Sequence, residues 1–119
     1  MPLNLKLHYV EFPATDIPAT KQFFENAFSW TFEDFGPDYS SFSDQGLSGG
    51  FYQSDLTSVA SKGAALLVLL SEDLEKTQSL VERLGGKICT PIFSFTGGRR
   101  FHFIEPSGNE LAVWSLIGT

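Results

Sequence analysis

The sequence predicts an α+β fold in which two βαβββ modules form one curved, mostly antiparallel sheet around a concave pocket, with the helices on its outer face. Two observations lead to this fold class. The predicted elements run strand, helix, strand, strand, strand, and the same order then repeats. A chain of 119 residues can form one domain with a real core, whereas each half alone is too small for one. We expect a single domain over residues 1–119, with modules at about 6–52 and 64–116 and a linker at 53–63.

The first module is predicted to open with a strand at residues 6–12, where aromatic and branched residues cluster before Pro13. A helix should follow, because Asp16 is a good N-cap and Pro18 is tolerated in a first helical turn. Its apolar face should consist of Phe23, Phe24, Ala27 and Phe28, which stand at helical spacing. The helix should end near residue 29, and three short strands are expected at 31–35, 39–43 and 50–52, between turns rich in glycine, proline and aspartate.

The second module repeats this order after the polar linker. A fully apolar strand is predicted at 65–70, and Ser71 should cap the helix that follows. The inner face of that helix should carry Leu74, Thr77, Val81 and Leu84, and Gly85-Gly86 should end it. Three more strands are expected at 87–90, 99–104 and 110–116, with a hairpin turn at 106–109 between the last two.

The chain is acidic, with a formal net charge of −6 and a pI near 4.7. This charge argues against a phosphate-binding surface, so no nucleic-acid partner is expected. The longest apolar run, residues 64–70, is too short to cross a bilayer, and the first residues show no secretion signal. The single cysteine, Cys89, excludes an internal disulfide and fits a reducing compartment. We therefore expect a cytoplasmic protein without a membrane partner.

Several short motifs resemble one known family. They lie at residues 11–16 (EFPATD), 23–30 (FFENAFSW), 73–74 (DL), 84–87 (LGGK) and 103–110 (FIEPSGNE). In their order and spacing they are similar to the vicinal oxygen chelate superfamily, which includes glyoxalase I, extradiol dioxygenases, fosfomycin-resistance proteins and bleomycin-binding proteins. The resemblance runs from about residue 6 to 116. Phe24 and Ser29 depart from the family, which usually has a Phe-Tyr pair and Phe-Gly-Trp there.

The resemblance also implies where a metal would be bound. Metal-using members take ligands from the first and fourth strands of each module. The corresponding positions here are Tyr9, a residue within 47–52, Leu66 and Ala112, and none of them offers a conventional donor. A catalytic divalent metal needs about three converging protein ligands. We therefore expect neither a metal site nor another cofactor.

Strand alternation then selects the residues that face the pocket. If Tyr9 faces it, so does Glu11, and if Ala112 does, so do Glu110 and Trp114. The resemblance to fosfomycin-resistance proteins adds Arg100 and His102. We thus expect a small-molecule site with Glu11 and His102 as candidate catalytic residues and with five ligand-binding residues, Tyr9, Phe51, Arg100, Glu110 and Trp114. Glu11 and Arg100 could equally form a structural ion pair, and His102 could be a general base or a satisfied polar residue.

Three functions follow from these residues. The first is a metal-independent small-molecule binding protein, similar to the acidic, dimeric bleomycin-binding members that sequester a cationic ligand. The second is a metal-free lyase or isomerase in which Glu11, His102 and Arg100 perform acid–base chemistry. The third, glyoxalase- or dioxygenase-type metal chemistry, lacks its ligands. A homodimer is also expected, because the family pairs its subunits and because 12 phenylalanines exceed what so short a chain can easily bury.

Overall fold

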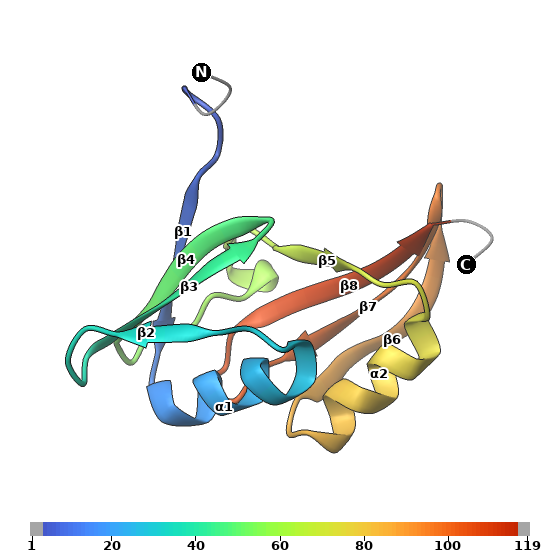
Figure 1. The fold of residues 1–119 in the computed structure, drawn as a ribbon. Helices are drawn as coiled ribbons and strands as arrows, with labels where there is room; N and C mark the ends of the chain where they lie inside the picture. Colours follow the sequence, from blue (N-terminus) through green and yellow to red (C-terminus); the bar gives the residue numbers. More distant parts are fainter. Residues whose placement is uncertain (1–3, 117–119) are drawn as a thin grey trace.

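The computed structural model describes residues 4–116, which form two βαβββ modules (Figure 1). The elements of the first module are β1 (Tyr9–Ala14), α1 (Ile17–Phe28), β2 (Phe32–Asp34), β3 (Tyr39–Gln45) and β4 (Leu47–Gln53). The segment between the modules contains a short 3₁₀ helix at Ala60–Lys62. The second module consists of β5 (Val68–Leu70), α2 (Leu74–Arg83), β6 (Lys87–Phe95), β7 (Gly98–Ile104) and β8 (Glu110–Leu116). The predicted α+β class and the repeated order are confirmed.

Each module forms its own four-stranded mixed sheet. The strand order is β1-β4-β3-β2 in the first sheet and β5-β8-β7-β6 in the second. In both sheets the first strand runs parallel to the last, and the other pairs are antiparallel. Within the described residues β1 and β5 pair only with β4 and β8, so the outer edge of each remains free in one chain.

Local sequence explains α1 well. The Asp16 side chain accepts a hydrogen bond from the backbone N–H of Ala19, at 3.0 Å, as an N-cap should. Ser29 ends the helix in the left-handed conformation, with φ of 61°. Phe23, Phe24 and Ala27 are buried on one face, as their spacing predicts.

One hydrophobic core joins the two modules. Phe23 and Phe28 of α1 pack against Phe103 of β7, with ring centroids 5.7 and 6.2 Å apart. Leu74 and Val81 of α2 are fully buried in the same core. Each sheet therefore has one face turned toward the helices and the core, and one open face turned away from them.

A buried polar network also links the modules at the hairpin between β7 and β8. The carboxylate of Glu105 accepts hydrogen bonds from the Thr20 hydroxyl (2.7 Å), the Ser107 backbone N–H (2.5 Å) and the Asn109 side-chain amide (2.7 Å). The Asn109 amide also donates to the Pro13 carbonyl at the end of β1, at 2.7 Å. Burial raises the pKa of Glu105 even though these three donors favour its ionised form.

Several element boundaries differ from the prediction. Strand β1 runs through Pro13, and β6 runs through Pro91 to Phe95, because both are edge strands in which a missing N–H is tolerated. The apolar stretch before α2 becomes a strand only at Val68. The N-cap of α2 is Asp73 rather than Ser71, whose hydroxyl instead accepts from the Asp73 backbone N–H. Neither helix in the described part of the chain is long and apolar enough to span a bilayer.

Candidate functional site

A hydrogen-bonded chain of three side chains stands on the open face of the first sheet. We call Tyr9, Tyr39 and Glu11 the tyrosine cluster. The Tyr39 hydroxyl donates to the Glu11 carboxylate at 2.9 Å, and the hydroxyls of Tyr9 and Tyr39 are 2.5 Å apart. Because Tyr39 has given its only proton to Glu11, Tyr9 must be the donor in the second bond. The exposed Glu11 carboxylate keeps further acceptor capacity.

Gly50 makes this arrangement possible. Strand β4 lies between β3 and β1, so the ring of Tyr39 must cross β4 to reach Glu11. A Cβ at Gly50 would stand 2.2 Å from the Tyr39 hydroxyl oxygen. Burial and the hydrogen bonds to Tyr9 and Glu11 raise the pKa of Tyr39 far above its ordinary value, so its phenol stays protonated.

The open face of the second sheet carries a different set of groups. We call the residues Phe93, Phe95, Arg100, His102, Glu110 and Trp114 the arginine face. They share it because β7 pairs Arg100 with Phe93 and with Trp114, and because His102 and Arg100 are two residues apart on one strand. Glu110 of β8 lies on the same face, because it is two residues before Ala112, and Ala112 pairs with His102.

His102 and Glu110 form a partly buried pair on the arginine face. Nδ1 of His102 lies 2.8 Å from Oε2 of Glu110, and the side chains are 12% and 13% exposed. The Ala60 backbone N–H donates to the other carboxylate oxygen at 3.0 Å. The hydrogen bond from His102 holds the pKa of Glu110 below its ordinary value, so the carboxylate is ionised and fixes the proton on Nδ1. Nε2 of His102 is buried and has no hydrogen-bond partner among the described residues.

Arg100 lies over two neighbouring phenylalanine rings on the same face, whose centroids are 6.5 Å apart. Its guanidinium carbon is 5.3 Å from the ring centroids of both Phe93 and Phe95. Its Nε is buried and lacks a hydrogen-bond acceptor among the described residues. The Phe95 ring also contacts Trp114, at 6.1 Å between centroids. The arginine face thus combines an aromatic surface with two buried nitrogen atoms that find no partner within residues 4–116.

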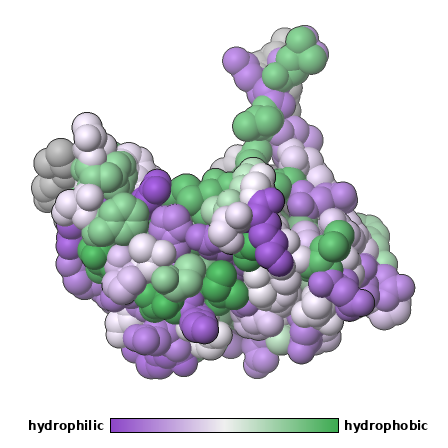
Figure 2. All heavy atoms as spheres, turned by 180° about the vertical axis from the view of Figure 1, so that it is seen from behind, coloured by the Kyte–Doolittle hydropathy of each residue, from purple (hydrophilic) through white to green (hydrophobic). Residues whose placement is uncertain are grey.

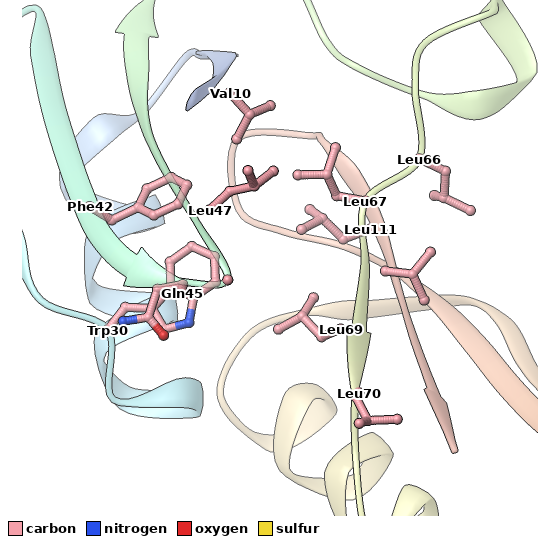
Figure 3. Close-up of a pocket in the computed structure, with 12 residues that line it drawn as sticks. Val10, Trp30, Phe42, Gln45, Leu47, Leu66, Leu67, Leu69, Leu70 and Leu111 are labelled. Atoms are coloured by element: carbon pink, nitrogen blue, oxygen red, sulfur yellow. The ribbon is translucent and has the colours of Figure 1, made fainter. Parts of the chain in front are cut away.

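A cavity lies elsewhere, between the first sheet and β5 (Figure 3). This groove has a volume of about 710 Å³, and most of its lining side chains are apolar, with Gln45 as the exception. It is lined by Val10, Trp30, Phe42, the turn 45–47, residues 66–70 and Leu111. None of the residues predicted to bind a ligand is among them. The groove lies beside the free edge of β5 and opens on the helix-facing side of the first sheet, which Val10 and Phe42 share with Phe12.

The structure places six of the seven predicted site residues on open faces. Tyr9 and Glu11 lie in the tyrosine cluster, and Arg100, His102, Glu110 and Trp114 lie on the arginine face. Phe51 is the exception, because it is 1% exposed and stacks on Phe12 in the core. Alternation along β4 puts Gly50, not Phe51, on the open face.

Glu11 and Arg100 do not form an ion pair within the described part of the chain. The hydrogen-bond partner of Glu11 is Tyr39 on its own sheet, and that of His102 is Glu110 on the other. The tyrosine cluster and the arginine face are therefore separate within one chain.

Three residues of these faces were missed in the sequence. Phe93 and Phe95 lie beyond Pro91, where the strand was expected to have ended. Register shifts on both sides of Thr90 interrupt the alternation of β6, so no local pattern shows that both rings share the face of Arg100. Tyr39 was placed in a strand but not in the site, since no local pattern shows that its ring crosses Gly50.

The donor set does not suit the metal that such a fold can bind. No three His, Cys, Asp or Glu side chains within residues 4–116 are grouped as ligands would be. The four positions that correspond to ligands hold Tyr9, residues of the glycine-rich β4, Leu66 and Ala112. The residues at these positions therefore do not fit a catalytic metal ion.

Comparison with known proteins gives the same fold. The family model of the Glyoxalase/Bleomycin resistance protein/Dioxygenase superfamily matches residues 6–113. A glyoxalase-related enzyme from Fulvimarina pelagi superposes with a TM-score of 0.78 at 13% identity, over 93% of this chain and 88% of that one. A glyoxalase/bleomycin resistance protein/dioxygenase family enzyme from Burkholderia phytofirmans PsJN gives 0.79 at 14% identity, over 94% and 99%.

A lactoylglutathione lyase from Agrobacterium tumefaciens is also similar, with a TM-score of 0.73 at 11% identity over 93% of both chains. No curated protein matches the sequence. At these identities the similarity to solved structures establishes the fold. The function has to be inferred from the residues of this chain.

Proposed function

Because the chain belongs to the Glyoxalase/Bleomycin resistance protein/Dioxygenase superfamily, we propose that it is a metal-independent small-molecule binding protein whose pocket uses the open faces of its sheets. The observation that supports this most is the arginine face, where Nε of Arg100 and Nε2 of His102 are buried without partners beside three aromatic rings. Small-molecule sites combine apolar walls with a few unsatisfied polar groups in this way. Buried polar atoms otherwise have partners, so these two favour a ligand.

We also propose a homodimer in which the tyrosine cluster of one copy and the arginine face of the other form one site. The free edges of β1 and β5 each expose a row of backbone donors and acceptors. Next to them, large apolar side chains are exposed, with Leu5 at 96%, Leu7 at 88% and Leu70 at 62%. Figure 2 shows the N-terminal segment standing clear of the body, with a hollow beside it that has hydrophobic residues at its base. Addition of β1 of one copy to β5 of another would cover these residues.

Such pairing would also bring the tyrosine cluster of one copy toward the arginine face of the other. Glu11 lies on the edge strand β1, and Ala112, beside His102, pairs with Val68 on the edge strand β5. The tyrosine cluster would then supply hydroxyls and an acceptor, and the arginine face a cation and aromatic rings. In this arrangement each face would be completed by the other copy.

A second function has one specific observation in its favour. In the pair of His102 and Glu110, the carboxylate holds the proton on Nδ1 and leaves the lone pair of Nε2 free to accept another. Imidazole in this state is a general base near neutral pH. A metal-free lyase or isomerase could therefore take a proton from a ligand with His102, while Arg100 stabilises the resulting oxyanion.

Binding can be tested by nuclear magnetic resonance on ¹⁵N-labelled protein dialysed against a chelator. A set of small aromatic acids, amides and amines would be added, and the shifts of backbone amides and of the Trp114 indole would be recorded. We expect saturable shifts at the open-face residues of β6, β7 and β8. Shifts confined to the lining of the groove, such as Leu69 and Leu111, would contradict the proposal, as would no saturable shift with any compound.

A further inference from the structure

Arg100 combines partial burial with the lack of a counter-ion. Its Nε is buried, yet no carboxylate among the described residues lies within ion-pair distance of its guanidinium. Its neighbour Arg99 points to the other face of β7 and forms two hydrogen bonds with Glu75, one of them at 3.1 Å. A partly buried charge without a counter-ion costs free energy unless something else supplies one.

The surroundings of Arg100 hold the guanidinium in place. Phe93 and Phe95 both contact it at 5.3 Å, and Trp114 is its partner across the β7–β8 ladder. The rings contact the guanidinium, but they are not conventional acceptors for its five N–H groups. A fixed guanidinium of this kind matches a carboxylate, which accepts two parallel N–H bonds from it.

The charges on this face favour a carboxylate over a phosphate dianion as the bound anion. Arg100 is the permanent cation among the aromatic rings, because Lys87, which pairs with Ile104 on the same side of the sheet, stands four residues away along β7. Glu110 on the same face is ionised and paired with His102. A phosphate dianion would therefore meet one cation and one carboxylate, whereas a carboxylate adds a single charge that Arg100 can neutralise. The rings of Phe93, Phe95 and Trp114 would pack against a flat apolar body attached to that carboxylate.

From these groups we propose that the arginine face binds a small aromatic carboxylate, held by an ion pair with Arg100 and by packing on Phe93, Phe95 and Trp114. This inference rests on the proposed binding function and names its ligand class. The net charge of −6 favoured a cationic ligand, whereas this inference names an anionic one. The difference arises because the site carries a local cation that the total charge of the chain does not reveal.

The test follows the Nε–H resonance of Arg100 in the ¹⁵N-labelled full chain while benzoate, benzamide or benzylamine is added. These probes have similar rings but are anionic, neutral and cationic. We expect benzoate to shift the Arg100 Nε–H and the Trp114 indole with an affinity about tenfold or more above that of the other two, as a charged hydrogen bond implies. Arg100→Gln should abolish this preference, whereas Arg99→Gln, the matched change on the opposite face, should keep it.

Four results would overturn the inference. Equal or tighter binding of benzamide or benzylamine on the same face would refute the ligand class and leave the binding function standing. No shift with any probe would contradict both. Retention of the benzoate preference in Arg100→Gln would show that another group holds the carboxylate. A shift of the Arg100 Nε–H on Glu11→Gln alone, before any probe is added, would show that Glu11 of a second copy is its counter-ion.

Discussion

Substitution of Gly50 by alanine tests whether the tyrosine cluster depends on a bare backbone. The new methyl would lie 2.2 Å from the hydroxyl oxygen of Tyr39 and 2.5 Å from its ring carbon Cζ. The ring would have to leave its path across β4 and lose its bonds to Tyr9 and Glu11. Two such bonds contribute about 1–3 kcal/mol together, and alanine in a strand returns roughly 0.5–1 kcal/mol. We expect a net loss of about 1–2 kcal/mol.

The sign of this effect should reverse when Tyr39 is absent. In a Tyr39→Ala background the space above Gly50 is empty, so Gly50→Ala should stabilise the protein by about 0.5–1 kcal/mol. Urea unfolding of the four proteins, followed by tryptophan fluorescence, gives the coupling free energy directly. Equal effects of Gly50→Ala in both backgrounds would show that the ring of Tyr39 does not cross this position.

Three further predictions concern metal, assembly and pH. Elemental analysis of protein purified without chelator should find less than one Zn, Ni, Mn or Fe per chain; one equivalent that is lost when Tyr9 is replaced would refute this. Light scattering should give twice 13.1 kDa, and Leu7→Asp, at a side chain exposed in one chain, should give 13.1 kDa. A wild-type mass of 13.1 kDa at every concentration would exclude the dimer. Because burial raises the pKa of Glu105, its contribution to the free energy of unfolding should be lost as pH rises from about 4.5 through its folded pKa. Urea unfolding at several pH values should show this slope in the wild type and not in Glu105→Gln.

Local sequence predicted the elements that depend on neighbouring residues. Helix α1 follows from its Asp16 cap and its phenylalanine spacing, and the end of α2 follows from Gly85-Gly86. Alternation from Tyr9 and Ala112 predicted that Glu11, Glu110 and Trp114 share the faces of these anchors, and the pairing of the strands places them so.

The remaining features depend on pairing between distant strands. Phe51 was predicted to line the pocket but lies in the core. Its face is set by the register of β4 with Phe12 of β1, and no local pattern in the sequence records that register. The same holds for Tyr39, whose role requires the strand order β3-β4-β1. The edge positions of β1 and β5 likewise follow from the strand order, which no local pattern records.

The central claim is that small molecules bind the open faces without a metal, and isothermal titration calorimetry tests it most directly. The compound that binds most tightly in the resonance screen would be titrated into protein dialysed against EDTA, and again after addition of Zn²⁺ or Mn²⁺. We predict one site per chain with the same dissociation constant in all three titrations. Binding that appears only after a metal is added would contradict the account.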